Sequence, residues 1–396
     1  MLNSLRNKLV LAYATVTLPP LIALGWYGGS RIETTLRDQG LERLETRVDV
    51  LSVQIERFLA GTDGDLLLLA DTPALGQYLL ALDSGDAALM GAARKNLAQG
   101  FVRLSEIRGT YHQIRYIDAS GAERIRVDRN GNATTVVAAE RLETRRSGTD
   151  FDDAMKAPKG TVLVSAMALN RENGAIEDPH RPVIQYSTPV FDASAHRRGV
   201  LIIGVAADPI LDLVAKAPGS GEKLLLVDAN GSYLSNPEPG KRFGGDRDLK
   251  TGENLVKDYP ELGPQILAEK SLFRSESRDM VTLAKSIAVP GVNNASLGVL
   301  VDLMPTDVLY KTASQFRMVF NILTLVALVI ALAFGALVAH FVTRPIMALT
   351  EAVERMSRGN LEQPIEVVSN DETQTLAIAM ERLRKSMKLM LDKYAD

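Results

Sequence analysis

The chain has 396 residues, of which 46% are hydrophobic, and its formal net charge is −3 at pH 7. This length can hold two or three domains, and the slightly acidic balance argues against a basic nucleic-acid-binding face. The sequence contains no cysteine, which excludes disulfides, thiolate metal sites and thiol nucleophiles.

The first predicted element is an apolar segment at residues 9–28, which is long enough to cross a bilayer as a helix. Arg6 and Lys8 precede it, and Trp26 and Tyr27 near its far end suit a membrane interface. The alternative is a cleaved signal peptide, but the segment lacks a good cleavage site near its end. We therefore expect an uncleaved membrane anchor.

A helix with a narrow apolar stripe is predicted next. The spacing of its apolar residues is 3-4-3-4-3, through Leu41, Leu44, Val48, Leu51, Ile55 and Phe58. Such a stripe can pack against its own domain or against a second copy of the chain. Because a receptor with one span on each side of its sensor has to pair somewhere, we favour a dimer helix.

Two cycles of strand, Asp-x-x-Gly turn and returning strand follow. In the turns, aspartate bonds the backbone amides and glycine supplies a positive φ. The strands of the first cycle are 113–117, 123–127, 161–165, 183–187 and 199–205. The second cycle starts at Lys223, and its strands are 224–228, 232–234, 281–288 and 295–301. The pattern predicts two mixed α/β modules in tandem, with antiparallel sheets and a long leading helix.

A second apolar run, Met318–Phe341, is followed by Arg344 and is also long enough to span a membrane. Positive charges lie outside both apolar segments, which places both chain ends in the cytoplasm. Residues 29–317 are then expected to face outward, into the periplasm of a Gram-negative bacterium.

Two short amphipathic helices are predicted after the second span. Pro345 marks where the first begins afresh, and Gly359 and Leu361 lie in the break that ends it. Asp371–Glu372 opens the second helix. The apolar face of the second helix consists of Leu376, Met380, Leu383, Met387 and Met390. Two such helices below a span are typical of a coupling device rather than an active site.

The outward region resembles the double-Cache (tandem PAS-like) sensors of bacterial receptors. In the first module the resemblance rests on Ile114–Asp118, Gly121, Glu123, Arg126–Val127, Ser165, Asn170, Glu172, Gly174, Glu177, Pro179, Pro182–Ile184 and Thr188–Asp192. In the second it rests on Leu226–Asp228, Gly231, Tyr233–Leu234 and Pro237. The tail resembles a HAMP domain through Arg344–Ile346, Gly359, Leu361 and Asp371–Glu372, although Gln374 stands where that family usually has glycine.

The resemblance implies an α+β fold: a long N-terminal helix with tandem PAS-like (dCache) modules, two transmembrane helices and a dimeric parallel four-helix HAMP coiled coil. The expected domains are a cytoplasmic N-terminus at 1–8, a first transmembrane helix at 9–28, a sensor at 29–317, a second transmembrane helix at 318–342 and HAMP at 343–396. Within the sensor, a membrane-distal module is expected at about 66–208 and a proximal module at about 209–305.

In such sensors the distal module normally carries the ligand pocket. The polar residues predicted to contact a ligand there are Tyr111, Arg115, Arg126, Gln185 and Tyr186. An arginine in a dry pocket can hold a carboxylate through two parallel hydrogen bonds, which indicates a small anionic or polar organic ligand. Two alternatives stay open: Asp118 is better explained as a turn residue than as a contact, and Arg115 and Arg126 can be exposed cross-strand partners of Glu123.

The residues predicted to relay the signal are Pro345, Leu349, Gly359, Leu361, Glu372, Leu376, Met380 and Leu383. No metal site is predicted, because His112, His180 and His196 lie far apart in the sequence. No catalytic residues and no cofactor are predicted either, since no nucleophile and base stand in a recognisable order.

These observations predict a homodimeric sensor in the bacterial inner membrane that binds a small molecule outside and signals to a cytoplasmic protein. The chain stops at Asp396, so we expect no catalytic domain within it. The alternative is the input half of a longer receptor enzyme, a histidine kinase, diguanylate cyclase or PP2C-type phosphatase. A chemoreceptor is less favoured, because the long signalling hairpin is absent.

Overall fold

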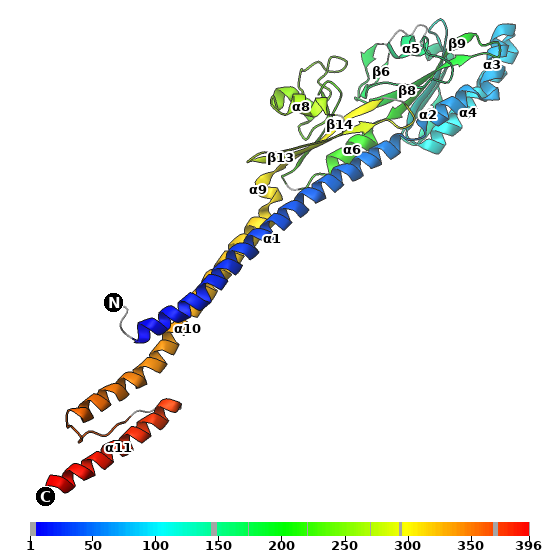
Figure 1. Cartoon of the computed structure of the whole chain (residues 1–396). Helices are drawn as coiled ribbons and strands as arrows, with labels where there is room; N and C mark the ends of the chain where they lie inside the picture. Colours follow the sequence, from blue (N-terminus) through cyan, green and yellow to red (C-terminus); the bar gives the residue numbers. More distant parts are fainter. Residues whose placement is uncertain are drawn as a thin grey trace. The chain divides into compact units, whose positions relative to one another are not determined.

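The structure is a computed structural model that describes residues 5–143, 149–172, 174–219, 221–269, 271–292, 295–366 and 371–395. The chain divides into two compact units (Figure 1). One is a sensor unit, Gln39–Leu309, and the other combines Met1–Asp38 with Tyr310–Asp396. The helix α1 (Leu5–Leu59) contributes residues to both.

Two antiparallel sheets form the sensor unit. The first has the order β3-β2-β1-β9-β8-β4, with β5 also paired to β8. Its strands are β1 (Tyr111–Asp118), β2 (Glu123–Asn130), β3 (Ala133–Val136), β4 (Leu163–Val164), β5 (Ala168–Leu169), β8 (Pro182–Phe191) and β9 (Arg197–Ala206). A small ladder pairs β6 (Arg171–Glu172) with β7 (Ala175–Ile176). We call the part of the sensor unit around this sheet the first module.

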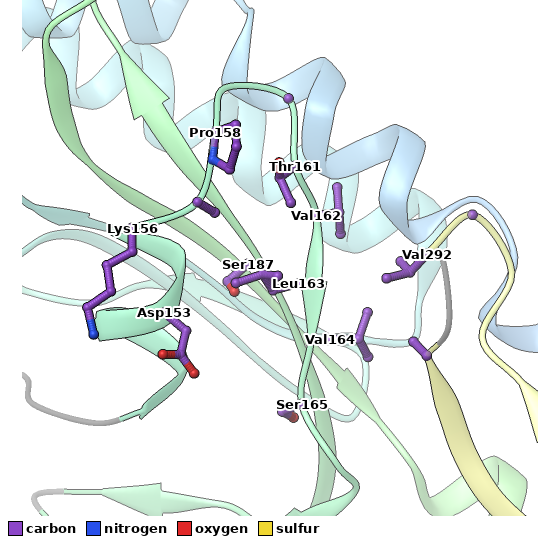
Figure 2. Close-up of a pocket in the computed structure, with 14 residues that line it drawn as sticks. Asp153, Lys156, Pro158, Thr161, Val162, Leu163, Val164, Ser165, Ser187 and Val292 are labelled. Atoms are coloured by element: carbon purple, nitrogen blue, oxygen red, sulfur yellow. The ribbon is translucent and has the colours of Figure 1, made fainter.

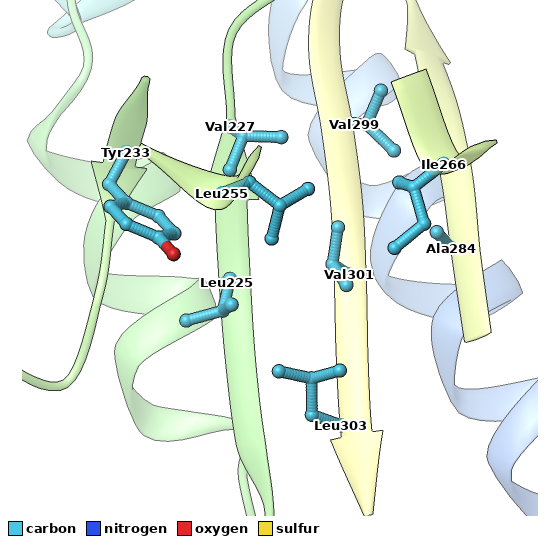
Figure 3. Close-up of a cluster of buried hydrophobic side chains, with 9 residues drawn as sticks. All are labelled: Leu225, Val227, Tyr233, Leu255, Ile266, Ala284, Val299, Val301 and Leu303. Carbon is cyan, nitrogen blue, oxygen red and sulfur yellow. The ribbon is translucent and has the colours of Figure 1, made fainter. Parts of the chain in front are cut away.

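The second sheet has the order β11-β10-β14-β13-β12 and belongs to what we call the second module. Its strands are β10 (Lys223–Val227), β11 (Tyr233–Ser235), β12 (Leu272–Glu276), β13 (Met280–Ala288) and β14 (Ser296–Pro305). On one face lies a core of buried apolar side chains, to which α7 (Leu255–Asp258) and α8 (Gly263–Ala268) contribute Leu255 and Ile266 (Figure 3). The two antiparallel sheets, together with the helices of each module, confirm the predicted α+β fold class.

The helices of the sensor unit are mostly short. In the first module they are α2 (Thr62–Ala70), α3 (Pro73–Ser84), α4 (Ala87–Arg108), η1 (Ala139–Arg141) and α5 (Thr149–Ala154). In the second they are α6 (Asp208–Lys216), η2 (Pro239–Lys241), α7 (Leu255–Asp258), α8 (Gly263–Ala268) and α9 (Thr306–Leu309). Local signals set the ends of α3 and α4: Thr72 and Asp86 cap their first turns, and the left-handed residues Gly85 and Gly109 end them.

The two modules repeat one local design. Asp118 accepts hydrogen bonds from the backbone amides of Ser120 and Ala122, so its interpretation as a turn residue is confirmed. Asp228 does the same for the amides of Asn230 and Ser232.

A glycine lies opposite each of these turns. A Cβ atom at Gly199 would lie 2.0 Å from the carbonyl oxygen of Ile117, and one at Gly298 would lie 2.1 Å from that of Val227. Each returning strand therefore needs glycine at that position, where φ is also strongly positive.

The apolar stripe of α1 is buried within the sensor unit. Five of the six predicted residues are no more than 6% exposed, namely Leu41, Leu44, Val48, Leu51 and Ile55. The sixth, Phe58, is only partly buried, and its neighbour Leu59 is the buried residue at that end of the stripe. Ion pairs join α1 to the second sheet, from Glu45 to Arg274 at 3.0 Å and from Asp49 to Lys285 at 2.8 Å. The prediction that the stripe pairs two copies is wrong, because the chain's own sensor covers it, and the intramolecular alternative is confirmed.

In the other unit, α10 (Lys311–Ser357) and α11 (Glu372–Ala395) are the main elements. Two helices, α1 and α10, are long and apolar enough to cross a membrane. They approach closely at glycines: a Cβ at Gly25 would lie 2.7 Å from the Thr324 side chain, and one at Gly335 would lie 2.5 Å from Tyr13. Small residues at a helix contact are typical of membrane helix pairs.

The helix α10 runs without interruption through Pro345. The prediction that the helix begins afresh there is therefore wrong. An internal proline removes one backbone hydrogen bond, and here the flanking turns continue the helix on both sides. The helix ends instead just before Gly359, which has a φ of +84°, as the sequence predicted.

Candidate functional site

The register of the first sheet sorts its polar residues onto two faces. Gln113, Gly204 and Gln185 lie in one row across β1, β9 and β8, and Arg115 lies in the next row with Ile202 and Ser187. Arg126 is the direct partner of Arg115 on β2. Because residues two apart on a strand share a face, these rows lie on the same side of the sheet. We call this the polar face, defined by Gln113, Arg115, Arg126, Asp128 and Gln185.

Two of the five predicted ligand residues lie on the opposite face. Tyr111 pairs with Val205, and a register shift separates it from Gln113. Its hydroxyl donates to the Asp65 carboxylate of α2 at 2.5 Å, and Arg108 also binds Asp65. Tyr186 lies on the same side, and burial together with the Asp63 charge raises the pKa of its phenol. The structure thus brings Arg115, Arg126 and Gln185 together and leaves Tyr111 and Tyr186 facing α2.

Carboxylates hold both arginines of the polar face in place. Arg115 is 2% exposed and binds Glu123 at 3.2 Å. The alternative that Arg115 pairs with Glu123 therefore holds, but the pair is buried rather than exposed. Burial lowers the pKa of Arg115 and raises that of Glu123, as expected when both charges leave water. Arg126 binds Asp128 at 2.8 Å and also pairs with Glu172 of β6. Burial disfavours its charge, yet these carboxylates raise the pKa of Arg126.

Two polar atoms of this face have no hydrogen-bond partner among the described residues: Nε of Arg115 and Oε1 of Gln185. Both atoms are buried, where an unsatisfied donor or acceptor costs about 1–3 kcal/mol. Gly204 lies between Gln113 and Gln185 in their row and has no side chain to fill the space. The face therefore offers one donor and one acceptor, and Gly204 contributes no side chain to the row between Gln113 and Gln185.

A cavity of about 900 Å³ lies at the β4 edge of the sheet (Figure 2). Ser187, next to Gln185 on the same face of β8, contributes to its wall. The segment that follows α5 lines the cavity up to Leu163, the strand partner of Ser187, and Val292 of the second module also reaches it. The cavity thus borders the polar face and touches both modules. Sequence reasoning missed this contribution of the second module, because no local pattern indicates which distant loop will close an edge.

No group of three or more histidine, aspartate or glutamate residues that could hold a metal ion is present in the described residues. His112 lies instead beside Arg181, whose guanidinium is 2.7 Å from Nδ1.

The predicted relay residues lie in and around a small core between α10 and α11. Leu349 and Leu361 are buried in it with Ala352, Met356, Ile365 and Ala377, and Met380 packs against it. In a single chain, Leu376 and Leu383 are 48% and 56% exposed. Glu372 is exposed at the start of α11.

Two polar residues of α11 fix the connector between the helices. Arg384 donates to the backbone oxygen of Leu361, and Glu381 accepts from the backbone amide of Ile365 at 2.9 Å. Arg384 and Glu381 also bind each other at 2.7 Å. The apolar spacing gave no signal for these residues, because their role is to satisfy backbone groups of the connector rather than to fill the core.

Two family models match this chain, one in the sensor unit and one in the unit that contains α10 and α11. The model of the bacterial histidine kinase sensor domain matches residues 82–283, about half of the chain, and the HAMP domain model matches residues 337–388. These matches confirm the predicted sensor and the predicted HAMP domain.

Among curated proteins, the sensor protein kinase WalK of Staphylococcus aureus strains JH9 and Newman is 30% identical over 79 residues. That match covers 20% of this chain and only 13% of the length of WalK.

Two solved structures share the fold of the sensor unit. One is a domain of a sensory box/GGDEF family protein from Vibrio parahaemolyticus, with a TM-score of 0.59 and 18% identity over 69% of this chain and 99% of that one. The other is the extracellular domain of the histidine kinase vpHK1S-Z8, with a TM-score of 0.58 and 18% identity over 71% of this chain and 96% of that one.

Proposed function

Because the chain belongs to the family of bacterial histidine kinase sensor domains and carries a HAMP domain, we propose that it is the input part of a two-span receptor. It binds a small polar organic molecule at the polar face of the first module. The HAMP helices then pass the change to a cytoplasmic kinase domain. The observation that carries the binding proposal is the pair of buried atoms on Arg115 and Gln185 that have no hydrogen-bond partner in the part of the chain that the structure describes.

The chemistry of the ligand follows from those two atoms. Nε of Arg115 donates, so the ligand presents an acceptor such as a carboxylate or hydroxyl oxygen. Oε1 of Gln185 accepts, so the ligand also presents an N–H or O–H donor. The two residues lie on β1 and β8, two strand spacings or about 10 Å apart, which suits a molecule of roughly amino-acid size. Because Glu123, Asp128 and Glu172 already neutralise the arginines, a zwitterion or a polyhydroxylated acid fits better than a multiply charged anion.

The proposed topology follows from the charges beside the two membrane helices. Lys8 precedes the first apolar segment and Arg344 follows the second, so both ends of the chain lie in the cytoplasm. The sensor unit then faces the periplasm, and the protein belongs to the inner membrane. The expected domain boundaries, with HAMP at 343–396, are part of this proposal.

We further propose that two copies pair through HAMP. Leu376 and Leu383 are large apolar side chains left half exposed on α11, next to the buried Ala377 and the partly buried Met380. A second copy can cover them in a parallel four-helix bundle, as a seam with 3-4 spacing favours. The relay then acts through repacking of this bundle, since a ligand shifts a two-state protein only by its differential affinity for the two states.

A kinase output is proposed because both the family model and the WalK match belong to histidine kinases. The kinase domain is either fused after the HAMP domain or supplied by a separate protein.

The binding proposal is tested with the full chain in lipid nanodiscs against a panel of amino acids, hydroxy acids and dicarboxylates. A ligand is expected to raise the midpoint of thermal unfolding, by the linkage between binding and stability. Gly204→Ala should lose most of that shift, because the added methyl group lies between Gln113 and Gln185, where the ligand is proposed to bind. The variant should still fold, since its Cβ meets Gln113 only at ordinary contact distances of 3.6 Å or more.

Gly91→Ala is the matched control, because Gly91 lies on α4 with nothing within 4 Å of an added Cβ. It should keep the full ligand-induced shift. An equal shift in Gly204→Ala and the wild type would show that the ligand binds elsewhere.

A further inference from the structure

A buried pair of carboxylic acids lies in the second module, away from the polar face. Asp302 of β14 is 1% exposed, and the side chain of Glu222, just before β10, is fully buried. Arg47 of α1 binds Glu222 through both carboxylate oxygens, and Glu222 also accepts from the backbone amide of Gly219. Glu222 is thus satisfied by its partners.

Asp302 lacks such donors. Within the described ranges, no N–H or hydroxyl group donates to either of its buried carboxylate oxygens. Its polar neighbour is the carboxyl of Glu222, with which it can share a hydrogen bond only when one of the two acids carries a proton. The register places it between Leu224 on β10 and Leu283 on β13, so its flanks in the sheet are apolar. A charged carboxylate in such a place is strongly disfavoured unless a cation or donors compensate it.

The other charged groups around the side of the second sheet that carries Asp302 are paired with one another or exposed. From α1 and the sheet, Glu45 binds Arg274 and Asp49 binds Lys285. From α6, the exposed Asp212 and Lys216 form their own pair, and Asp307 of α9 is exposed. Among the described residues, only Arg47 provides a positive charge to the two acids. The cluster therefore holds two acids for one cation.

This arrangement has a clear effect on protonation. Burial, and then the neighbouring Glu222 carboxylate, raise the pKa of Asp302 to about 8, while Arg47 opposes them. Asp302 therefore keeps its proton to a much higher pH than an ordinary aspartate does. With that proton bound, the cluster has one negative charge for one positive charge, and without it the cluster has two negative charges.

We propose that Asp302 and Glu222, held by Arg47, form a proton-binding site through which the receptor responds to external pH. With the proton bound, Arg47 and Glu222 form a balanced pair that holds α1 against the second sheet. When the proton leaves, the second negative charge is buried without compensation and the packing of α1 on β10 and β14 weakens. The ligand of this site is the proton itself.

The position of the cluster couples it to the proposed signal path. Arg47 belongs to α1, the helix that begins at Leu5 and includes the first membrane segment. Asp302 lies three residues before the end of β14, and α9 and α10 follow directly. The proton thus acts on the two elements that continue into the membrane helices. The inference rests on the receptor role proposed above, but not on the ligand at the polar face.

The test uses the full chain in lipid nanodiscs, with protons as the only ligand. Infrared difference spectra between pH 6.5 and 9.5 are expected to show loss of a protonated carboxyl band in the wild type, and Asp302→Asn should abolish that loss. The midpoint of thermal unfolding should fall by about 3 °C or more over the same interval in the wild type and stay flat in Asp302→Asn. Asp49→Asn is the control: it removes an exposed ion pair at the same helix–sheet contact, and it should keep the wild-type pH dependence.

A second variant keeps the test decisive if Asp302→Asn does not fold. Arg47→Gln removes the cation that opposes protonation, so the carboxyl titration should move to higher pH. A purely structural role for Arg47 would lower the thermal midpoint equally at all pH values and leave the titration where it was. Absence of a titrating carboxyl band in the wild type, or wild-type pH dependence in Asp302→Asn, would overturn the proposal.

The proposal of a ligand site and the proposal of a proton-binding site can be refuted independently. Gly204→Ala should retain the proton response, and Asp302→Asn should retain stabilisation by the small-molecule ligand. Loss of the proton response alone therefore leaves the ligand site standing, and the reverse also holds.

Discussion

Arg115 and Arg126 stand directly opposite each other on β1 and β2, with both side chains on the polar face. Like charges at opposed positions on a sheet destabilise it unless other groups compensate them. Here Glu123 compensates Arg115, while Asp128 and Glu172 compensate Arg126. The acids therefore determine whether this face can hold two guanidinium groups at all.

Removing one of these acids should reveal its role. In Glu123→Gln, Arg115 remains buried without its counter-charge, and we expect the free energy of unfolding to fall by about 3 kcal/mol. Chemical denaturation of the full chain measures the change. Glu140→Gln alters an exposed residue of η1 and should change stability by less than about 0.5 kcal/mol. A similarly small effect of Glu123→Gln would mean that Arg115 does not depend on this pair.

The packing of α1 gives a second prediction. Leu51 is 6% exposed, whereas its neighbour Val50 is 48% exposed. Leu51→Ala should lower the free energy of unfolding by about 3 kcal/mol, because it leaves a cavity under the helix. Val50→Ala on the outer side should cost less than about 0.5 kcal/mol. Equal effects at the two positions would contradict the burial of the stripe within the sensor unit.

The stripe also shows what the sequence can and cannot predict. A 3-4 spacing correctly predicts a helix with one buried side, and it correctly selects Leu44, Val48 and Ile55. It does not identify the partner, because a sheet and a second helix both accept the same apolar stripe. The expectation that a two-span receptor has to pair, and not the spacing itself, therefore favoured the wrong partner here.

The ligand residues illustrate a second limit. Alternation along β1 predicts the faces of its residues correctly from Gln113 to Ile117. The register shift between Tyr111 and Gln113 then moves Tyr111 to the other face. A bulge of this kind leaves no clear mark in the sequence, so the sequence did not show that Tyr111 and Arg115 lie on opposite faces of the sheet.

His112, at this same shift, should make the sensor sensitive to acid. Burial, and then the charge of Arg181, lower the pKa of His112 from its usual value of 6.5, so the folded protein keeps it neutral. The unfolded chain takes up a proton as the pH falls below about 6.5 and the folded chain does not, so folding loses stability there. His112→Gln should therefore lose less stability than the wild type between pH 7 and pH 5.

The measurement is the difference in free energy of unfolding between variant and wild type at each pH, which cancels the contributions of other acids. His196→Gln is the control, because the side chain of His196 is 78% exposed. If the wild type and His112→Gln lose stability in parallel as the pH falls, His112 is not the group responsible.

The HAMP connector gives the last prediction. Leu361 is 6% exposed and lies in the core between α10 and α11, so an aspartate at this position would have to leave the core or be buried with its charge. We expect Leu361→Asp to displace the connector from the core between α10 and α11. As a consequence, the way in which two copies pair through α11 should change. The chain contains no cysteine, so a disulfide introduced at Leu383→Cys reports that pairing without background.

In membranes, oxidation should join two copies at Leu383→Cys and much less at Lys385→Cys, which lies about 200° further around the helix. Asn360→Asp is the matched control for Leu361→Asp, because it places the same charge at the adjacent exposed position. The control should leave the crosslink yield at Leu383→Cys unchanged, whereas Leu361→Asp should change it several-fold. Since Leu361 anchors the connector to both helices, an unchanged yield would mean that α11 pairs independently of the connector, and that the signal reaches it by another route.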